Sequence, residues 1–187
     1  FIRTSMVRMD ALIKEILKLS RAGRRPLEPT PISSRDLMET CVASIRQRFA
    51  EADATVSLED TLPDLVSDPS ALSQIFTNLL DNAAKYLVAD RPGRIVVRGR
   101  IAGPSAVFDI EDNGRGIAPN DHERIFDLFR RAGVQDRPGD GIGLAHSRAL
   151  ARRLGGDVTV DSDGSSGTVF HVYVARDLAA RLRSGHI

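Results

Sequence analysis

The sequence predicts an α+β fold, a two-layer sandwich in which helices cover one face of a mixed, mostly antiparallel sheet. The strand-like segments "RIVVRGRIA" and "SAVFDIED" follow one another across a short turn, as do "DVTVDSD" and "TVFHVYVA". Such hairpins pair antiparallel. Helical and strand-like segments also do not alternate one for one, as they do in sheets built from parallel βαβ units. These two observations carry the fold prediction.

Composition limits the classes of protein to consider. Of the 187 residues, 42% are hydrophobic and 27% are charged, which is typical of a globular chain. The net charge of +1 argues against a nucleic-acid binder that relies on a basic surface. Cys41 is the single cysteine, which leaves no disulfide framework and no thiolate metal site. No run approaches the ~20 apolar residues of a membrane span, so we expect no membrane contact from this chain.

The first residues have a heptad spacing that predicts a helix over residues 1–25. An isolated helix of this length is marginal in water, so we expect its apolar stripe to pair with a partner helix in a homodimer. An amphipathic helix packed on its own domain is the alternative. The chain begins with Phe1 inside this helix, and we expect it to be a piece of a longer protein. The stripe consists of Ile2, Met6, Met9, Ile13 and Ile16, with Leu12 and Leu19 alongside.

Residues 26–32 are predicted to be an extended linker. Gly23 suits a helix C-terminus, and the three prolines of "RAGRRPLEPTP" separate the helix from everything after it. We then expect one globular domain over residues 33–175 and a C-terminal tail over residues 176–187.

The globular domain is predicted to open with a helix, two strands and a second helix. Ser33 and Ser34 offer an N-cap for a helix that runs to about Glu51. The segments "ATVSLED" and "DLVS" are typical of strands, and Asp68 marks the start of the second helix.

Two further helices are predicted between the hairpins. The first is short and covers about residues 119–130. The second starts near Gly141 and stops at Gly155, after a loop that contains Gly139.

The helix that follows Asp68 has a polar stripe within "QIFTNLLDNAAKYL". At 100° per residue, Asn78, Asn82 and Lys85 form one narrow stripe beside a broad apolar face. A solvated face more often carries Glu, Lys and Arg, which are stronger helix formers than Asn. The stripe therefore suggests neutral amides used as ligands, and taken alone it leaves a solvated face as the alternative.

The strand "SAVFDIED" ends in a carboxylate on its apolar side. Alternation puts Phe108, Ile110 and Asp112 on one face, where a carboxylate needs hydrogen-bond donors to offset its burial. Gly114 and Gly116 follow at once and allow a tight turn with close backbone approach. An aspartate that opens onto such a turn is suited to accept the amino hydrogens of a base such as adenine.

A glycine loop precedes the last predicted helix in "RPGDGIGLAHSRALARRL". Gly139, Gly141 and Gly143 leave free backbone N–H groups at the positive end of a helix dipole, which predicts a phosphate cradle. The loop is not a Walker A motif because the Gly-Lys pair is missing. His146 stands where a dinucleotide-binding fingerprint requires Gly.

Together, these segments resemble the catalytic and ATP-binding core of sensor histidine kinases, in the GHKL family that also holds gyrase, mismatch-repair and chaperone ATPases. "NLLDNAAKY" resembles the N box, "DNGRG" the first glycine box, "IFDLFRR" the F box, "GDGIGLA" the second glycine box and "GT" at position 167 the last. The resemblance runs from about Asp68 to Val174 and implies a GHKL-type sandwich. The helix "MVRMDALIKEILKLSRAG" resembles the second helix of the family's dimerisation bundle.

The resemblance implies ATP and Mg²⁺ as cofactors and gives roles to matching residues. Asn82 would bind Mg²⁺ through its side-chain oxygen, with Asn78 near the phosphates. Lys85 would contact a phosphate, and Tyr86 would pack near the nucleotide. Arg131 would reach the γ-phosphate, so that Asn78, Asn82 and Arg131 form the catalytic set.

The resemblance also implies the adenine side of the site. Asp112 would accept the adenine amino group, supported by Gly116 and Thr168. Phe126 and Phe129 would anchor a mobile lid that ends at Gly141. The full implied set for ATP is Asn78, Asn82, Lys85, Tyr86, Asp112, Gly114, Gly116, Ile117, Arg131, Gly139, Gly141, Ile142, Gly143, Leu144 and Thr168.

Position 78 helps to separate reaction types. In the ATPases of this superfamily, a Glu one turn before the magnesium Asn activates water, whereas Asn78 cannot act as a base. Phosphoryl transfer needs positioning and charge neutralisation more than covalent help from the protein. Asn78 therefore favours transfer to another group over hydrolysis.

Two features depart from the family pattern. A histidine kinase needs a phosphoacceptor His followed by an acidic residue and, a few residues on, a Pro, and no histidine of this chain fits. Asp140 replaces the usual small hydroxyl residue of the second glycine box, and His146 replaces an aliphatic one. His146 would be either a core histidine or a contact of the lid, and the negative charge of Asp140 is unfavourable beside phosphates unless its side chain points outward.

The leading hypothesis is the catalytic core of a cytoplasmic histidine kinase that phosphorylates a His outside this chain and passes the group to a response-regulator receiver domain. One alternative is a degenerate kinase that acts in phosphotransfer or as a scaffold. Another is a GHKL enzyme with a different acceptor, such as a Ser/Thr kinase or a true ATPase.

Overall fold

The computed structural model describes residues 25–129 and 141–185. The predicted dimerisation helix, apart from Arg25, lies outside the described residues, and so does its expected contact in a homodimer. Gly139, Asp140 and Arg131 also lie outside them.

The main sheet of the described residues is mixed and mostly antiparallel. Its strands lie in the order β2–β4–β5–β7–β6. The first two strands in this order are parallel, and every other neighbouring pair is antiparallel. Both predicted hairpins, β4–β5 and β6–β7, are confirmed. The strands are β2 (Ala54–Leu58), β4 (Gly93–Ala102), β5 (Ser105–Asp112), β6 (Asp157–Asp161) and β7 (Thr168–Ala175).

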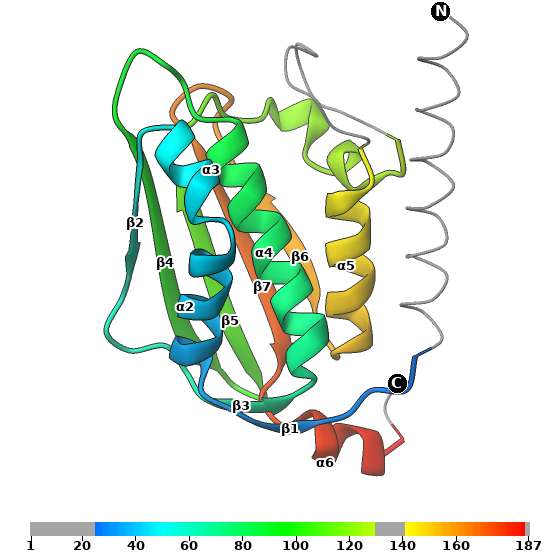
Figure 1. The fold of residues 1–187 in the computed structure, drawn as a ribbon. Coiled ribbons are helices and arrows are strands. Elements are labelled where there is room, and N and C mark those ends of the chain that lie inside the picture. The colour runs from blue at the N-terminus through cyan, green and yellow to red at the C-terminus, as the bar shows by residue number, and fades with distance from the viewer. Residues whose placement is uncertain (1–24, 130–140, 186–187) are drawn as a thin grey trace, which may run out of the picture.

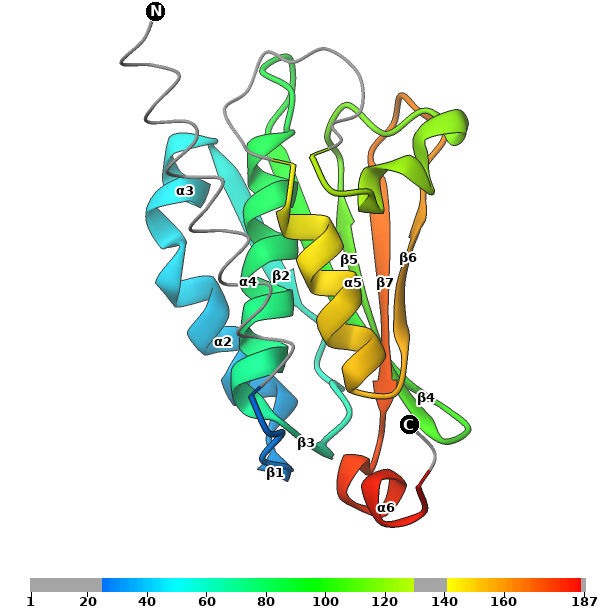
Figure 2. The same ribbon diagram turned by 90° about the vertical axis from the view of Figure 1, so that its right-hand side faces the viewer.

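Three helices cover one face of this sheet, as the sequence predicts (Figures 1 and 2). They are α2 (Ser34–Ser44), α4 (Pro69–Lys85) and α5 (Gly143–Arg153). The central helix α4 packs its apolar face on the sheet, and the Phe76 and Phe108 rings meet edge to face with centroids 5.0 Å apart. The core side chains with no exposed surface include Leu72, Ile75, Leu79, Leu80, Val97 and Ile110.

The start of α4 follows directly from its sequence. The Asp68 side chain accepts a hydrogen bond from the Ala71 N–H (2.9 Å), and Pro69 occupies the first helical position, where its missing N–H costs nothing. The second Asp68 oxygen accepts the Glu28 N–H (2.9 Å). Asp68 therefore caps the helix and also fastens the chain before β1 to the domain.

Two predicted helices differ from the structure. The helix predicted to run to Glu51 breaks at Ile45, whose φ of −120° is not helical, and continues as α3 (Arg46–Glu51). The helix predicted for residues 119–130 is instead two single 3₁₀ turns, η1 (Pro119–Asp121) and η2 (Arg124–Phe126). The second turn ends at Phe126, whose side chain is buried, and the next residue, Asp127, has extended backbone.

The predicted linker and tail both contain regular structure. Strand β1 (Thr30–Ile32) pairs antiparallel with β3 (Leu65–Ser67), in spite of its proline, because it is an edge strand with one neighbour. At the other end, α6 (Leu178–Arg183) is capped by Asp177 and buries Leu178 in the core. No helix among the described residues is long and apolar enough to span a membrane.

Candidate nucleotide-binding site

The polar stripe of α4 is not a solvated face. Asn78 and Asn82 are both half-buried. The Asn78 side-chain nitrogen donates to the Ser147 Oγ of α5 over 2.7 Å, so the two helices are joined by a hydrogen bond. Asn82 lies one turn further along α4, near the end of the helix, where its carbonyl accepts the Tyr86 N–H (3.1 Å).

Asp112 is buried at the end of β5 with only 6% of its surface exposed. Burial raises the pKa of its carboxyl to about 6, although hydrogen bonds from the backbone N–H groups of Gly114 and Thr168 act in the opposite direction. The Gly114 bond is 2.8 Å long. The buried carboxylate that strand alternation predicts is thus present, with Gly114 rather than Gly116 as its second donor. Thr168 reaches it because β5 and β7 pair these two residues.

The glycine turn after Asp112 packs against the end of α4. A Cβ atom on Gly114 would lie 2.5 Å from the Tyr86 carbonyl oxygen, so only glycine fits there. The Arg115 N–H donates to the same oxygen over 3.1 Å. Gly116 follows with a φ of +74°. The glycine turn after β5 and the C-terminal end of α4 are therefore in direct contact.

Ser162 holds the next part of the turn, and the sequence did not point to it. Its Oγ accepts the Ile117 N–H (2.9 Å) and donates to the Gly167 carbonyl (2.6 Å). Ile117 is thereby tied to the loop between β6 and β7. Local sequence gives no signal for this role because Ile117 lies 45 positions before Ser162 in the chain.

The described part of the glycine loop meets the Asn stripe. A Cβ atom on Gly143 would overlap the Asn78 Oδ1 atom, so a side chain at this position would displace the amide. Ile142 is buried and Leu144 is half-buried, which fixes the start of α5 in the domain. Of the residues predicted here, Gly139 and Arg131 lie outside the described chain.

The two predicted lid anchors behave differently. Phe126 is buried, with 9% of its surface exposed, whereas Phe129 is 49% exposed. Phe129 is held by its backbone, whose N–H donates to the Gly141 carbonyl over 3.0 Å. This bond places the backbone at Phe129 directly beside the glycine loop.

Tyr86 carries two cations on its ring at the edge of the site. The Lys85 Nζ lies 4.9 Å from the ring centroid, and the Arg115 guanidinium carbon lies 4.5 Å from it. Lys85, the predicted phosphate contact, is thus placed at the end of α4 beside Arg115, a second cation that the sequence did not indicate.

The metal-ligand chemistry of the site is limited. Among the described residues, no group of three or more His, Cys, Asp or Glu side chains is placed to hold a metal ion. Mg²⁺ in nucleotide sites is bound by one or two protein groups together with the substrate phosphates. The half-buried Asn82 amide fits that requirement.

Two of the histidines, His171 and His122, make hydrogen bonds to other parts of the domain. His171 stands on the outer face of the sheet, with its ring nitrogens 2.7 Å from Asp109 Oδ1 and 3.1 Å from Asp161 Oδ2. His122 is half-buried, with Nε2 3.2 Å from the Ile117 carbonyl.

Comparison with known proteins bears on this arrangement. Residues 67–178 match the model of the family described as histidine kinase-, DNA gyrase B-, and HSP90-like ATPase. The chain belongs to this ATPase family. Membership in it implies that the domain binds ATP.

Relatives of this ATPase domain include histidine kinases. The methanogenesis regulatory histidine kinase FilI of Methanothrix harundinacea (strain 6Ac) is 33% identical over 168 residues, which are 89% of this chain and 19% of FilI. The chain therefore spans about a fifth of the length of such a curated relative.

Two solved structures have the same fold as this ATPase domain. The mycobacterial sensor histidine kinase MprB has a TM-score of 0.67 and 28% identity, and the match covers 80% of this chain and 97% of that one. Full-length ShkA in complex with AMPPNP has a TM-score of 0.77 and 27% identity over 92% of this chain and 36% of that one.

Proposed function

We propose that this chain is the ATP-binding catalytic domain of a sensor histidine kinase. The observation that carries the proposal is that two elements finish, and a third begins, at the same edge of the sandwich (Figure 1). These are the C-terminal end of α4, the end of β5 with its glycine turn, and the first residues of α5. Each brings the chemistry that one part of ATP requires.

Adenine would be bound by the end of β5. Asp112 is an acceptor in a buried site, so a hydrogen bond to the adenine amino group is shielded from water. The buried carboxylate would also select adenine over a base that carries a carbonyl in place of the amino group, because two hydrogen-bond acceptors would then face each other without a donor. Gly114 and Gly116 allow the backbone to approach the base closely.

The phosphates would be bound between α4 and α5. The first residue of α5 is Gly143, where backbone N–H groups and the helix dipole favour an anion. Lys85 and Arg115 add positive charge at the C-terminal end of α4, beside the Tyr86 ring. Asn82 would hold Mg²⁺ through its side-chain oxygen, and the ion would neutralise phosphate charge.

The reaction we propose is phosphoryl transfer to a histidine other than the four of this chain. Asn78 stands one turn before Asn82, and its side-chain nitrogen is engaged with Ser147. An amide in this position cannot take a proton from water, so position 78 does not supply a base for hydrolysis. Transfer requires alignment and charge neutralisation instead, which the surrounding groups supply.

We infer the partners from the same family relationship. The helix over residues 1–25 would form a homodimer and bring the acceptor histidine of the bundle to the ATP site. A response-regulator receiver domain would then accept the group. Since the domain uses ATP, we place it in the cytoplasm.

The proposal is tested by joining an acceptor-bearing first bundle helix of a histidine kinase ahead of Phe1 and adding [γ-³²P]ATP with Mg²⁺. We expect acid-labile, base-stable label on the bundle histidine, and none when that histidine is changed to Gln. The unextended chain should bind ATP without labelling itself. Rapid release of free phosphate without labelling would show an ATPase instead, and acid-labile label on the unextended chain would contradict the assignment of the acceptor.

A further inference from the structure

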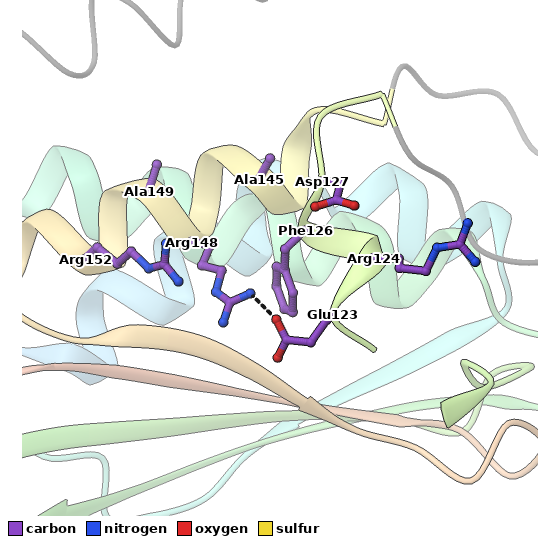
Figure 3. A pocket seen from close by; sticks show the side chains of 8 residues that line it. All are labelled: Glu123, Arg124, Phe126, Asp127, Ala145, Arg148, Ala149 and Arg152. Carbon is purple, nitrogen blue, oxygen red and sulfur yellow. Dashed lines mark hydrogen bonds and ion pairs between the residues drawn. The ribbon is translucent and has the colours of Figure 1, made fainter. Parts of the chain in front are cut away.

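A pocket of about 520 Å³ lies beside the outer face of α5, facing η2 and away from Asn78 (Figure 3). Ala145, Arg148, Ala149 and Arg152 of α5 line it, and the Arg148 side chain points to a different side of the helix from the two alanines. Figure 3 shows its guanidinium pointing toward Glu123, with Phe126 alongside. The proposed nucleotide site does not use any of these side chains directly.

Arg148 is first of all bound to the sheet. Its Nε lies 2.9 Å from Asp157 Oδ1 and its Nη2 lies 3.3 Å from Asp157 Oδ2, a two-point contact that fixes the plane of the guanidinium. These hydrogen bonds raise the pKa of Arg148, whereas burial acts to lower it. Asp157 is the first residue of β6, so α5 is attached here to the edge strand of the sheet.

The same guanidinium also holds the turn η2. Its Nη1 lies 2.9 Å from Glu123 Oε2, and its central carbon lies 4.6 Å from the centroid of the Phe126 ring. The Arg148 side chain is only 16% exposed, whereas the Glu123 side chain is 83% exposed. An exposed ion pair alone contributes little, so the stacking on Phe126 is the stronger part of this contact.

The described chain from Asp112 to Phe129 is consequently tied to other segments at several points. Ser162 holds its beginning at Ile117. Arg148 holds η2 further along, and the Phe129 N–H reaches the Gly141 carbonyl (3.0 Å). These contacts hold η2 and the residues beside it between the end of β5 and the start of α5.

We propose that Arg148 is a positioning residue for ATP: it fixes η2 against α5 and so sets the spacing between the Asp112 turn and the glycine loop. This inference rests on the proposed function. Adenosine needs only the Asp112 side of the site, whereas ATP must reach both sides at once. Loss of Arg148 is therefore expected to weaken ATP binding selectively.

The test compares Arg148→Met with Arg152→Met. Arg152 lines the same pocket and also bonds Asp157, at 3.3 Å, so its loss removes the same charge without freeing η2. In Arg148→Met, Asp157 keeps Arg152 as its partner, and the variant should fold. Dissociation constants for ATP and adenosine are measured by displacement of a fluorescent ATP analogue, with hydrogen exchange of residues 117–126 as a second readout.

We expect Arg148→Met to weaken ATP binding roughly tenfold, as for loss of one stacked and ion-paired arginine, with adenosine binding changed little. Hydrogen exchange in η2 should become faster, and Arg152→Met should change neither readout. Arg148→Lys keeps the charge but not the planar fork, so it should bind ATP as weakly as Arg148→Met. Glu123→Gln, on an exposed side chain, should give a smaller loss in the same direction.

An equal loss for ATP and adenosine, or ATP binding by Arg148→Met that matches Arg152→Met, would overturn the inference while the proposed function stands. Failure of the unaltered chain to bind ATP would overturn both.

Discussion

The Asn78 side-chain nitrogen lies 2.7 Å from the Ser147 Oγ, although the two residues are 69 positions apart in the chain. Ser147 has no exposed surface, so this bond is made away from water. The oxygen of the same amide borders Gly143. One side chain of α4 thus contacts both the interior of α5 and the residue at which that helix begins.

Ser147→Ala is expected to lower the free energy of unfolding by about 1 kcal/mol, because Asn78 loses its partner in a half-buried position. ATP binding should weaken several-fold, since the start of α5 is no longer held to α4. Denaturant unfolding and calorimetric titration measure the two effects. Ser73→Ala is the matched control: its hydroxyl lies on α4, 3.5 Å from the Cys41 sulfur, and its loss should leave ATP binding unchanged. Unaltered ATP binding by Ser147→Ala would contradict the proposed link.

Gly143→Ala tests how closely the glycine loop approaches the Asn stripe. The added Cβ atom overlaps the Asn78 oxygen, so either the amide or the start of α5 must move. We expect ATP binding to weaken at least about tenfold. The free energy of unfolding should change little, because the cost of the overlap is offset by the preference of alanine over glycine in a helix, ~1 kcal/mol.

Gly103→Ala provides the comparison for that substitution. A Cβ atom there meets no atom within 4 Å, but the φ of +58° strains any other residue. This variant should lose stability and keep its ATP affinity. If Gly143→Ala bound ATP as well as the unaltered chain, the loop would not serve as the phosphate cradle.

The pH dependence of adenosine binding tests the role of Asp112. Its pKa is raised to about 6 by burial, so a proton competes with the adenine amino group below that pH. The dissociation constant for adenosine should be constant above about pH 7 and rise below pH 6, approaching tenfold per pH unit. Adenosine is used because it has no phosphates that titrate in this range. In Asp112→Asn the side chain has no proton to gain or lose, so adenosine binding should be weak and independent of pH between about 5 and about 8. A pH profile identical to that of the unaltered chain would exclude Asp112 as the acceptor.

Asn82→Ala separates nucleotide contacts from metal contacts. Without Mg²⁺ the variant should bind ATP about as well as the unaltered chain, and added Mg²⁺ should no longer strengthen binding. Titrations with Mg²⁺ and with excess chelator give this difference directly. Asp81→Asn is the control at the neighbouring position. It removes the ion pair between Asp81 Oδ1 and Arg48 Nε (3.1 Å) and should retain the effect of Mg²⁺ on ATP binding. Full retention of that effect in Asn82→Ala would place the ion elsewhere.

Those parts of the site that depend on local periodicity could be predicted from the sequence. The helical stripe with Asn78 and the strand alternation that buries Asp112 are properties of single elements. Ser147 and Ser162 could not be predicted in the same way, because each acts on a partner in a distant segment. A serine inside a helix is a weak signal, since it is a poor helix former but also common on surfaces.

The fold shows the same limit at its edges. The hairpins and α4 have strong local signals and are confirmed. Strand β1 was not predicted because it contains Pro31, and a proline is tolerated only in an edge strand. The break at Ile45 and the two 3₁₀ turns have no such local signal: Ile45 leaves the helical conformation between two helical stretches, and the second turn ends where Phe126 is buried.

Calorimetric titration of ATP with Mg²⁺ into the chain is the most direct test of the central claim, that α4, the end of β5 and the start of α5 together bind the nucleotide. The account predicts one site per chain, with binding strongly weakened in Asp112→Asn and retained in Asp60→Asn, which removes the same charge from an exposed loop. No binding by the unaltered chain, or equal binding by both variants, would contradict it.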